Sequence, residues 1–201
     1  MADEAILMVA VEPPLNVGNS LMEACRRLSG DAGARGLRLT WVPPDLYAVP
    51  VVTLAPDNPE ARLFAMPRIQ AVTRAQEEIP VQLMPLTVEE GPDQTWQVMA
   101  RLTAQGSAIE DLGTRLVQEF SDTALVVTPI LPVGIRVASV TSEPVAAALR
   151  EMLPEGRNVP IAGWLLGGVH LMAATWRPEE RQYDLSRLRQ HPFRRLGSKP
   201  A

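Results

Sequence analysis

The 201-residue chain has few of the residues that most often carry chemistry, with one cysteine, two histidines and 4% aromatic residues. The single cysteine, Cys25, can form neither an internal disulfide nor a metal cluster, and no histidine lies near it in the sequence to activate it. We expect Cys25 to be a core residue. No other grouping of His, Cys, Asp or Glu has the spacing of metal ligands, so we predict no metal and no cofactor.

The sequence also lacks a basic leader and a long uninterrupted apolar run. It begins with acidic residues, and its longest apolar stretch, 159–174, contains a proline and glycines. We therefore expect a cytoplasmic protein with no membrane partner. The net charge of −4 excludes a molecule that holds nucleic acid through its overall charge. Residues 177–199 are locally basic, and both a solvated segment and a binding patch fit them.

Hydrophobic residues (46%) and charged residues (21%) are balanced as in an ordinary globular domain. We predict one domain over residues 1–190 and a basic, flexible tail over residues 191–201. Strand patterns alternate with helical ones, but paired strands recur too often for a doubly wound parallel sheet, so the fold class is α+β. The expected strands are 5–12, 37–42, 46–54, 81–88, 95–102, 124–131, 134–140 and one or two within 159–174. The expected helices are one that ends at Gly30 and three that span 58–78, 107–120 and 142–153.

Three features predict details within these elements. Pro50 inside its strand indicates an edge position or a bulge. Ser107 and Glu110 have the spacing of a capping box at the start of a helix. Glu12-Pro13-Pro14 follows the first strand where a nucleotide-binding fold would carry a glycine-rich loop, so neither a dinucleotide fold nor a P-loop is predicted.

The first strand with its Glu-Pro-Pro end, the following Arg26-Arg27-Leu28, and the segment Trp41-Val42-Pro43-Pro44-Asp45-Leu46-Tyr47 together resemble the opening of the LigT-like 2H phosphoesterases. That superfamily includes bacterial RNA 2′,3′-cyclic phosphodiesterases, also called 2′-5′ RNA ligases. The resemblance implies a bilobal α+β fold in which two antiparallel sheets form a central groove, with helices on the outer faces. Each lobe of such a fold contributes one H-x-T motif.

The histidines of both motifs are absent. Counted from Trp41, the first motif falls on Tyr47 and Val49, and a shifted register places it on Val51-Val52-Thr53. The best match to the second motif is Val126-Val127-Thr128, with valine in place of histidine. The family's reaction needs one histidine to accept a proton and the other to donate one, so neither register supplies a catalytic pair.

The resemblance and the missing histidines together predict a catalytically degenerate 2H-type domain that acts as a binding or protein-interaction module. Its partner in the groove would be a protein, a small nucleotide or an RNA end. Five valines of the motif strands would make the floor of that groove apolar, namely Val49, Val51, Val52, Val126 and Val127. A phosphodiesterase of altered mechanism is the alternative. We expect His170 to be a half-buried strand residue and His191 to be solvated. The candidate ligand contacts are Tyr47, Thr53, Thr128, Arg136 and His170.

Overall fold

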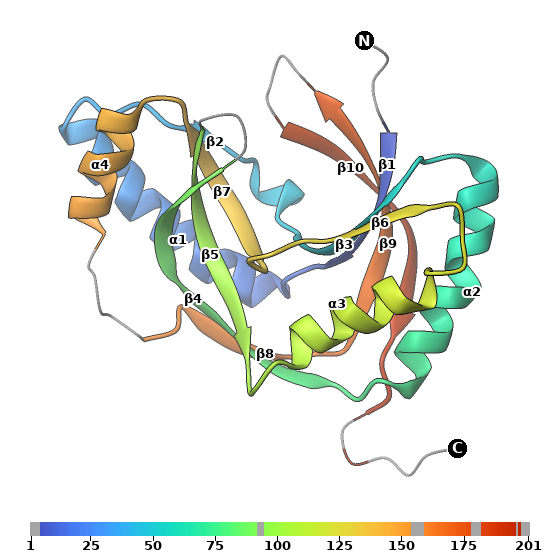
Figure 1. Cartoon of the computed structure of the whole chain (residues 1–201). Coiled ribbons are helices and arrows are strands. Elements are labelled where there is room, and N and C mark those ends of the chain that lie inside the picture. The colour runs from blue at the N-terminus through green and yellow to red at the C-terminus, as the bar shows by residue number, and fades with distance from the viewer. Residues whose placement is uncertain (1–4, 92–94, 154–158, 178–181, 196, 198–201) are drawn as a thin grey trace.

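The computed structural model describes residues 5–91, 95–153, 159–177, 182–195 and 197. Within them, the strands form two five-stranded sheets in which all neighbouring strands are antiparallel (Figure 1). The first sheet has the order β10-β9-β1-β3-β6, with β1 (Ala5–Val11), β3 (Val49–Ala55), β6 (Val126–Pro129), β9 (Gly168–Arg177) and β10 (Gln182–Pro192). The second has the order β2-β7-β5-β4-β8, with β2 (Thr40–Trp41), β4 (Ile79–Glu90), β5 (Trp96–Ala104), β7 (Gly134–Val140) and β8 (Ala162–Leu166). The predicted α+β class is confirmed.

The four α-helices of the described residues divide between the two sheets (Figure 1). Helices α2 (Pro59–Ala75) and α3 (Ala108–Glu119) pack on the first sheet, and α1 (Leu15–Ala34) and α4 (Glu143–Met152) pack on the second. A short 3-10 helix, η1 (Pro44–Leu46), precedes β3. No helix among the described residues is both long enough and apolar enough to span a membrane.

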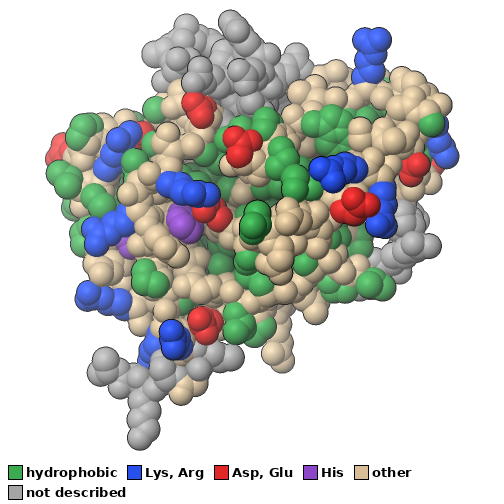
Figure 2. Space-filling view, turned by 180° about the vertical axis from the view of Figure 1, so that it is seen from behind, with side chains coloured by type: hydrophobic (Ala, Val, Ile, Leu, Met, Phe, Trp, Pro, Cys, Tyr) green, Lys and Arg blue, Asp and Glu red, His purple; other side chains and the backbone are tan. Residues whose placement is uncertain are grey.

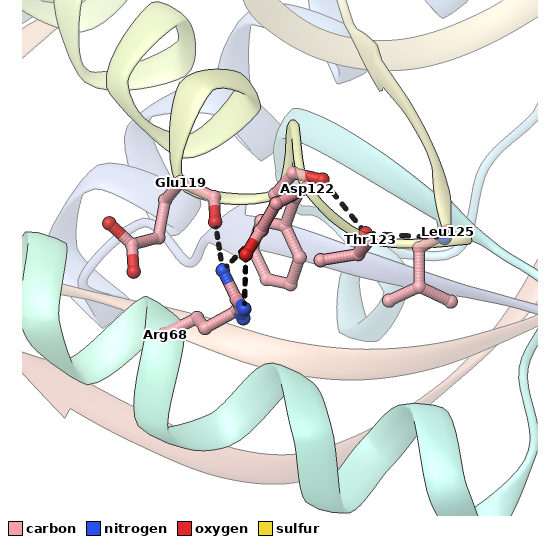
Figure 3. Close-up of polar contacts among 6 residues, drawn as sticks. Arg68, Glu119, Asp122, Thr123 and Leu125 are labelled. Carbon is pink, nitrogen blue, oxygen red and sulfur yellow. Dashed lines mark hydrogen bonds and ion pairs between the residues drawn. The ribbon is translucent and has the colours of Figure 1, made fainter.

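One ion-paired arginine ties α2 to the end of α3 (Figure 3). Arg68 donates to both carboxylate oxygens of Asp122, at 2.8 and 3.1 Å, and to the Glu119 carbonyl oxygen at 2.5 Å. Its guanidinium also lies 4.6 Å from the centre of the Phe64 ring. These contacts fix the two helices that cover the first sheet.

Three details predicted from local sequence patterns are wrong. Helix α1 continues through Gly30 to Ala34, and the chain turns only at Gly36, whose φ is +70°. The predicted strand 37–42 is reduced to Thr40–Trp41. The Ser107 side chain does not cap α3, because its hydroxyl donates to the Asp111 carboxylate instead of accepting a backbone N–H.

The two halves of the chain repeat one order of elements. The segment β1-α1-β2-β3-α2-β4 is followed by β5-α3-β6-β7-α4 and then β8 and β9. In the first sheet β9, β1, β3 and β6 are consecutive, and in the second β4, β5, β7 and β2 are consecutive. Strands β1 and β5 therefore occupy equivalent places, as do β3 and β7.

A β-bulge marks the same place in each half. In the first sheet Val52 pairs with Val9 and Pro50 with Ala10, so Val51 is the extra residue of β3. This confirms the bulge predicted from Pro50, although β3 is an interior strand of its sheet. In the second sheet, Ala138 and Arg136 pair with consecutive residues of β5, which makes Val137 the extra residue of β7. The two bulges therefore align β3 with β7, with Val51 opposite Val137 in the alignment.

Candidate functional site

The first sheet has one face covered by helices and one face that we call the open face. Leu7, Val9 and Val11 of β1 belong to the main core, whereas Met8 and Ala10, between them, belong to a separate small cluster with Met172 and Ala174 of β9. Since side chains alternate between the two faces of a strand, this small cluster marks the open face.

Two candidate ligand contacts lie together on the open face. Thr53 is the register partner of Met8 on β1 and of Thr128 on β6, so the three side chains share a face. The Thr53 hydroxyl donates to the Thr128 carbonyl oxygen at 3.4 Å. Val126, further along β6, is 67% exposed. The structure thus places the candidate second motif beside the first, within one sheet.

The repeat of elements identifies an equivalent of Val51-Val52-Thr53-Leu54 that lies in the second sheet. Aligned on the two bulges, this segment of β3 corresponds to Val137-Ala138-Ser139-Val140 of β7. In both segments a valine stands two residues before a hydroxyl side chain. The equivalence adds Ser139 as a candidate that sequence reasoning missed, and the register of the first motif stays a prediction.

A sequence signal for Ser139 did exist. Thr53 precedes the helix start Asn58-Pro59-Glu60, and Ser139 likewise precedes the helix start Ser142-Glu143-Pro144. The Val-x-Thr pattern also matches Val126-Val127-Thr128 of β6, so the pattern alone does not single out β7.

The valines at both bulges are core residues. Val51 is 2% exposed and Val137 is 0% exposed, and both belong to the main core. A methyl group of Val51 lies 3.6 Å from the place where a Cβ on Gly113 of α3 would stand. Val49 and Val52 are equally buried in the main core. The expectation that the motif valines form an apolar groove floor is therefore wrong for these three residues of β3.

Tyr47 is a buried residue whose hydroxyl points toward α1. It is 7% exposed and donates a 3.7 Å hydrogen bond to the Cys25 sulfur. Burial raises the pKa of the Tyr47 phenol, with the neighbouring Cys25 adding to the rise, and burial also raises the pKa of the Cys25 thiol. Both groups are therefore protonated at neutral pH, and the prediction that Cys25 is a core residue is confirmed.

His170 lies beside a charged pair that the sequence did not reveal. Its Nε2 is 3.8 Å from a Glu12 carboxylate oxygen, and Glu12 accepts a hydrogen bond from Nε of Arg187. Burial lowers the pKa of His170, Glu12 opposes this shift and Arg187 adds to it, so the imidazole is neutral at pH 7. Glu12 and Arg187 are 175 residues apart in the chain, at the end of β1 and on β10. The predicted half-buried state of His170 is confirmed.

A cavity of about 400 Å³ opens next to this charged pair. It lies between the end of β1, the first turns of α1, η1 and β10. Figure 2 shows a hollow on one face of the molecule, with hydrophobic side chains inside it and a histidine, acidic and basic side chains near it. The residues that line the cavity are Glu12, Pro13, Leu15, Gly18, Asn19, Met22, Pro44, Asp45, Tyr47 and Arg187.

His191 is buried, so the expectation that it is solvated is wrong. It is 2% exposed, because β10 continues to Pro192 and pairs His191 with Val169. Phe193 is buried as well, and Arg194 donates to Glu77 at 2.7 Å. Burial lowers the pKa of His191, and Arg189 and His170 lower it further. The first residues of the predicted tail are thus part of the sheet, whereas 196 and 198–201 lie outside the described residues.

Arg136 is the last of the candidate ligand contacts. Arg136 lies on β7 opposite Met99, at the place equivalent to Pro50 on β3, and is partly buried. Across the described ranges there is no group of three or more His, Cys, Asp or Glu side chains that could hold a metal ion.

Comparison with known proteins gives matches by structure alone. No protein-family model matches the chain, and no curated protein matches its sequence. The solved structure of TT0787 from Thermus thermophilus is similar with a TM-score of 0.66, at 18% identity over 95% of this chain and 99% of that one. E. coli LigT complexed with NADP+ is similar with a TM-score of 0.65, at 10% identity over 96% of this chain and 99% of that one.

A eukaryotic protein also shares the architecture. Usb1 from Kluyveromyces marxianus is similar with a TM-score of 0.54, at 11% identity over 92% of this chain and 97% of that one. At these identities the comparisons establish the fold and leave the activity open. The two antiparallel sheets, the four helices and the structural neighbours together show that the chain has the LigT-like 2H phosphoesterase fold.

Proposed function

We propose that the chain is a cytoplasmic, non-catalytic binding domain built on the LigT-like fold. The observation that carries this proposal is that β3 and β7, the equivalent strands of the two halves of the fold, contain no histidine. Positioned acid-base groups contribute roughly 10²- to 10⁴-fold each to a rate. A domain without either group keeps the scaffold but loses most of the rate of phosphodiester hydrolysis.

The hydroxyl groups that remain suit binding better than proton transfer. Thr53, Thr128 and Ser139 can donate and accept hydrogen bonds, but their side chains do not titrate near neutral pH. E. coli LigT has been solved with 3′-AMP, NADP+, ATP and phosphate, which makes nucleotides the first ligand class to test on this chain. A protein segment on the open face is the other partner class.

The contact between His170 and Glu12 favours one second candidate, a phosphodiesterase of altered mechanism. A neutral imidazole near a carboxylate has the form that a general base needs at pH 7. In this candidate a single histidine, placed on β9 instead of on the motif strands, would take a proton from water or from a ribose hydroxyl.

One experiment separates the two candidates. The protein is incubated with nucleoside 2′,3′-cyclic phosphates, product is followed by chromatography, and binding is followed by calorimetry, with an active 2H phosphoesterase as positive control. We expect no product above background. Product that disappears in His170→Ala but persists in Gln190→Ala, its cross-strand neighbour, would establish the second candidate. Product that persists in both variants would overturn both candidates.

The hydroxyl groups are tested by binding alone. If a nucleotide binds, Thr53→Ala and Ser139→Ala should each weaken it by about 2- to 10-fold, since a net hydrogen bond contributes about 0.5–1.5 kcal/mol. Thr103→Ala, an exposed strand residue outside the two motif segments, is the control and should bind as the parent does.

A further inference from the structure

The cavity at the end of β1 has walls of mixed charge and apolar character. Its charged groups are one guanidinium, on Arg187, and two carboxylates, on Glu12 and Asp45. We propose that this cavity binds a zwitterionic small molecule of the α-amino-acid type with an apolar side chain. The inference rests on the proposed function as a binding domain, and it adds a ligand class at a cavity whose lining includes neither Thr53 nor Ser139.

Arg187 provides the place for a carboxylate. Its side chain is 68% exposed, and its Nε is held by Glu12, which orients the guanidinium at the cavity wall. A guanidinium presents parallel N–H donors that match the two oxygens of a planar carboxylate. Because Glu12 fixes the guanidinium before a ligand arrives, less side-chain freedom is lost on binding.

The two carboxylates select against a phosphate and favour a cationic group. A phosphate monoester carries a charge close to −2 at neutral pH, and in this cavity it would lie near Glu12 and Asp45 with one guanidinium to offset three acidic groups. Asp45 is exposed and has no hydrogen bond or ion pair to any residue that the structure describes. An ammonium group on the ligand would supply its partner.

Apart from Asn19, the rest of the wall is largely apolar, and it is open enough for a side chain. Leu15, in the first turn of α1, is 82% exposed although it is a large hydrophobic residue, and Met22 lies about two turns further along the same helix. An apolar ligand side chain that covers Leu15 removes apolar surface of both partners from water. A cavity of about 400 Å³ lies within the size range of small-molecule sites.

The test compares three ligands that share the leucine side chain and differ in which charged groups they carry. Calorimetry or ligand-observed NMR measures binding of L-leucine, N-acetyl-L-leucine, which lacks the ammonium, and L-leucinamide, which lacks the carboxylate. We expect L-leucine to bind and each derivative to bind about tenfold or more weakly, because each loses a charged hydrogen bond. The variant Arg187→Gln should weaken L-leucine by a similar factor.

Arg189→Gln is the matched control, because Arg189 is an exposed arginine of the same strand that contacts Met66 of α2 instead of the cavity. It should bind L-leucine as the parent does. The inference is overturned if L-leucine does not bind at millimolar concentration, or if Arg187→Gln and Arg189→Gln bind it equally. In that case, binding of a nucleotide without hydrolysis leaves the proposed function intact. Hydrolysis of a cyclic phosphate overturns the proposed function, whether or not L-leucine binds.

Discussion

Placing histidines at the two bulge positions tests whether the valines there are core residues. In Val51→His and Val137→His the larger, polar imidazole replaces a side chain that is at most 2% exposed. Overpacking a core site costs about 1–3 kcal/mol, and a buried polar group without a partner costs about 1–3 kcal/mol more. Each variant should therefore lose about 2–6 kcal/mol of unfolding free energy, from a total of about 5–15 kcal/mol for a typical domain.

The assay is urea denaturation at pH 7.5, followed by circular dichroism, together with the cyclic phosphate assay. Thr53→His is the control, because Thr53 lies on the open face and is only partly buried; it should change the midpoint much less. We expect neither histidine variant, nor the double variant, to gain hydrolysis. A histidine variant that keeps the parental midpoint, or that hydrolyses the substrate, would show that residue 51 or 137 reaches the open face and would refute the core assignment.

Two further predictions concern stability. Arg68→Ala should lower the unfolding free energy by about 1–2 kcal/mol in urea melts, mainly through the lost charged hydrogen bond to the Glu119 carbonyl. Asp122→Ala removes the exposed partner of the same arginine and should lower the unfolding free energy clearly less. Equal losses in the two variants would contradict this assignment. Burial lowers the pKa of His191 from 6.5, so the unfolded chain binds the proton more tightly than the folded chain. The unfolding free energy should therefore be highest above pH 6.5 and decline as the pH falls below that value. Thermal melts between pH 7.5 and 5.5 measure the decline, which should be smaller in His191→Leu; an equal decline in both proteins would assign it to other groups.

Local sequence patterns predicted the elements because they depend on neighbouring residues. The alternation of apolar residues located β1, β7 and the buried face of α1, and Pro50 located a bulge. The Trp41 segment predicted the fold through resemblance. Helix α1 runs past Gly30 because its remaining turn still buries Ala32, a tertiary contact that outweighs the local preference of glycine.

The residues of the candidate site could not be predicted in the same way, because their neighbours depend on how the strands pair, and local sequence patterns do not give that register. Glu12 and Arg187 meet only because β9 pairs with both β1 and β10, which brings together residues from the two ends of the chain. His191 was expected to be solvated because it precedes Pro192 in an arginine-rich segment, yet its pairing with Val169 buries it. In both cases the partner strand decides which face a side chain occupies, and a shift of one residue reverses the outcome.

The bulge in β3 places the side chain of residue 51 and that of Thr53 on opposite faces of the first sheet. In a regular strand residues two apart share a face, so residue 51 would lie on the open face beside Thr53. The extra residue at each bulge breaks that alternation, and Val51 and Val137 turn toward the core. Thr53 follows the bulge, stays in register with Met8 and remains on the open face. A histidine at position 51 alone would therefore enter the core, and a return to the open face would need the bulge to be removed as well.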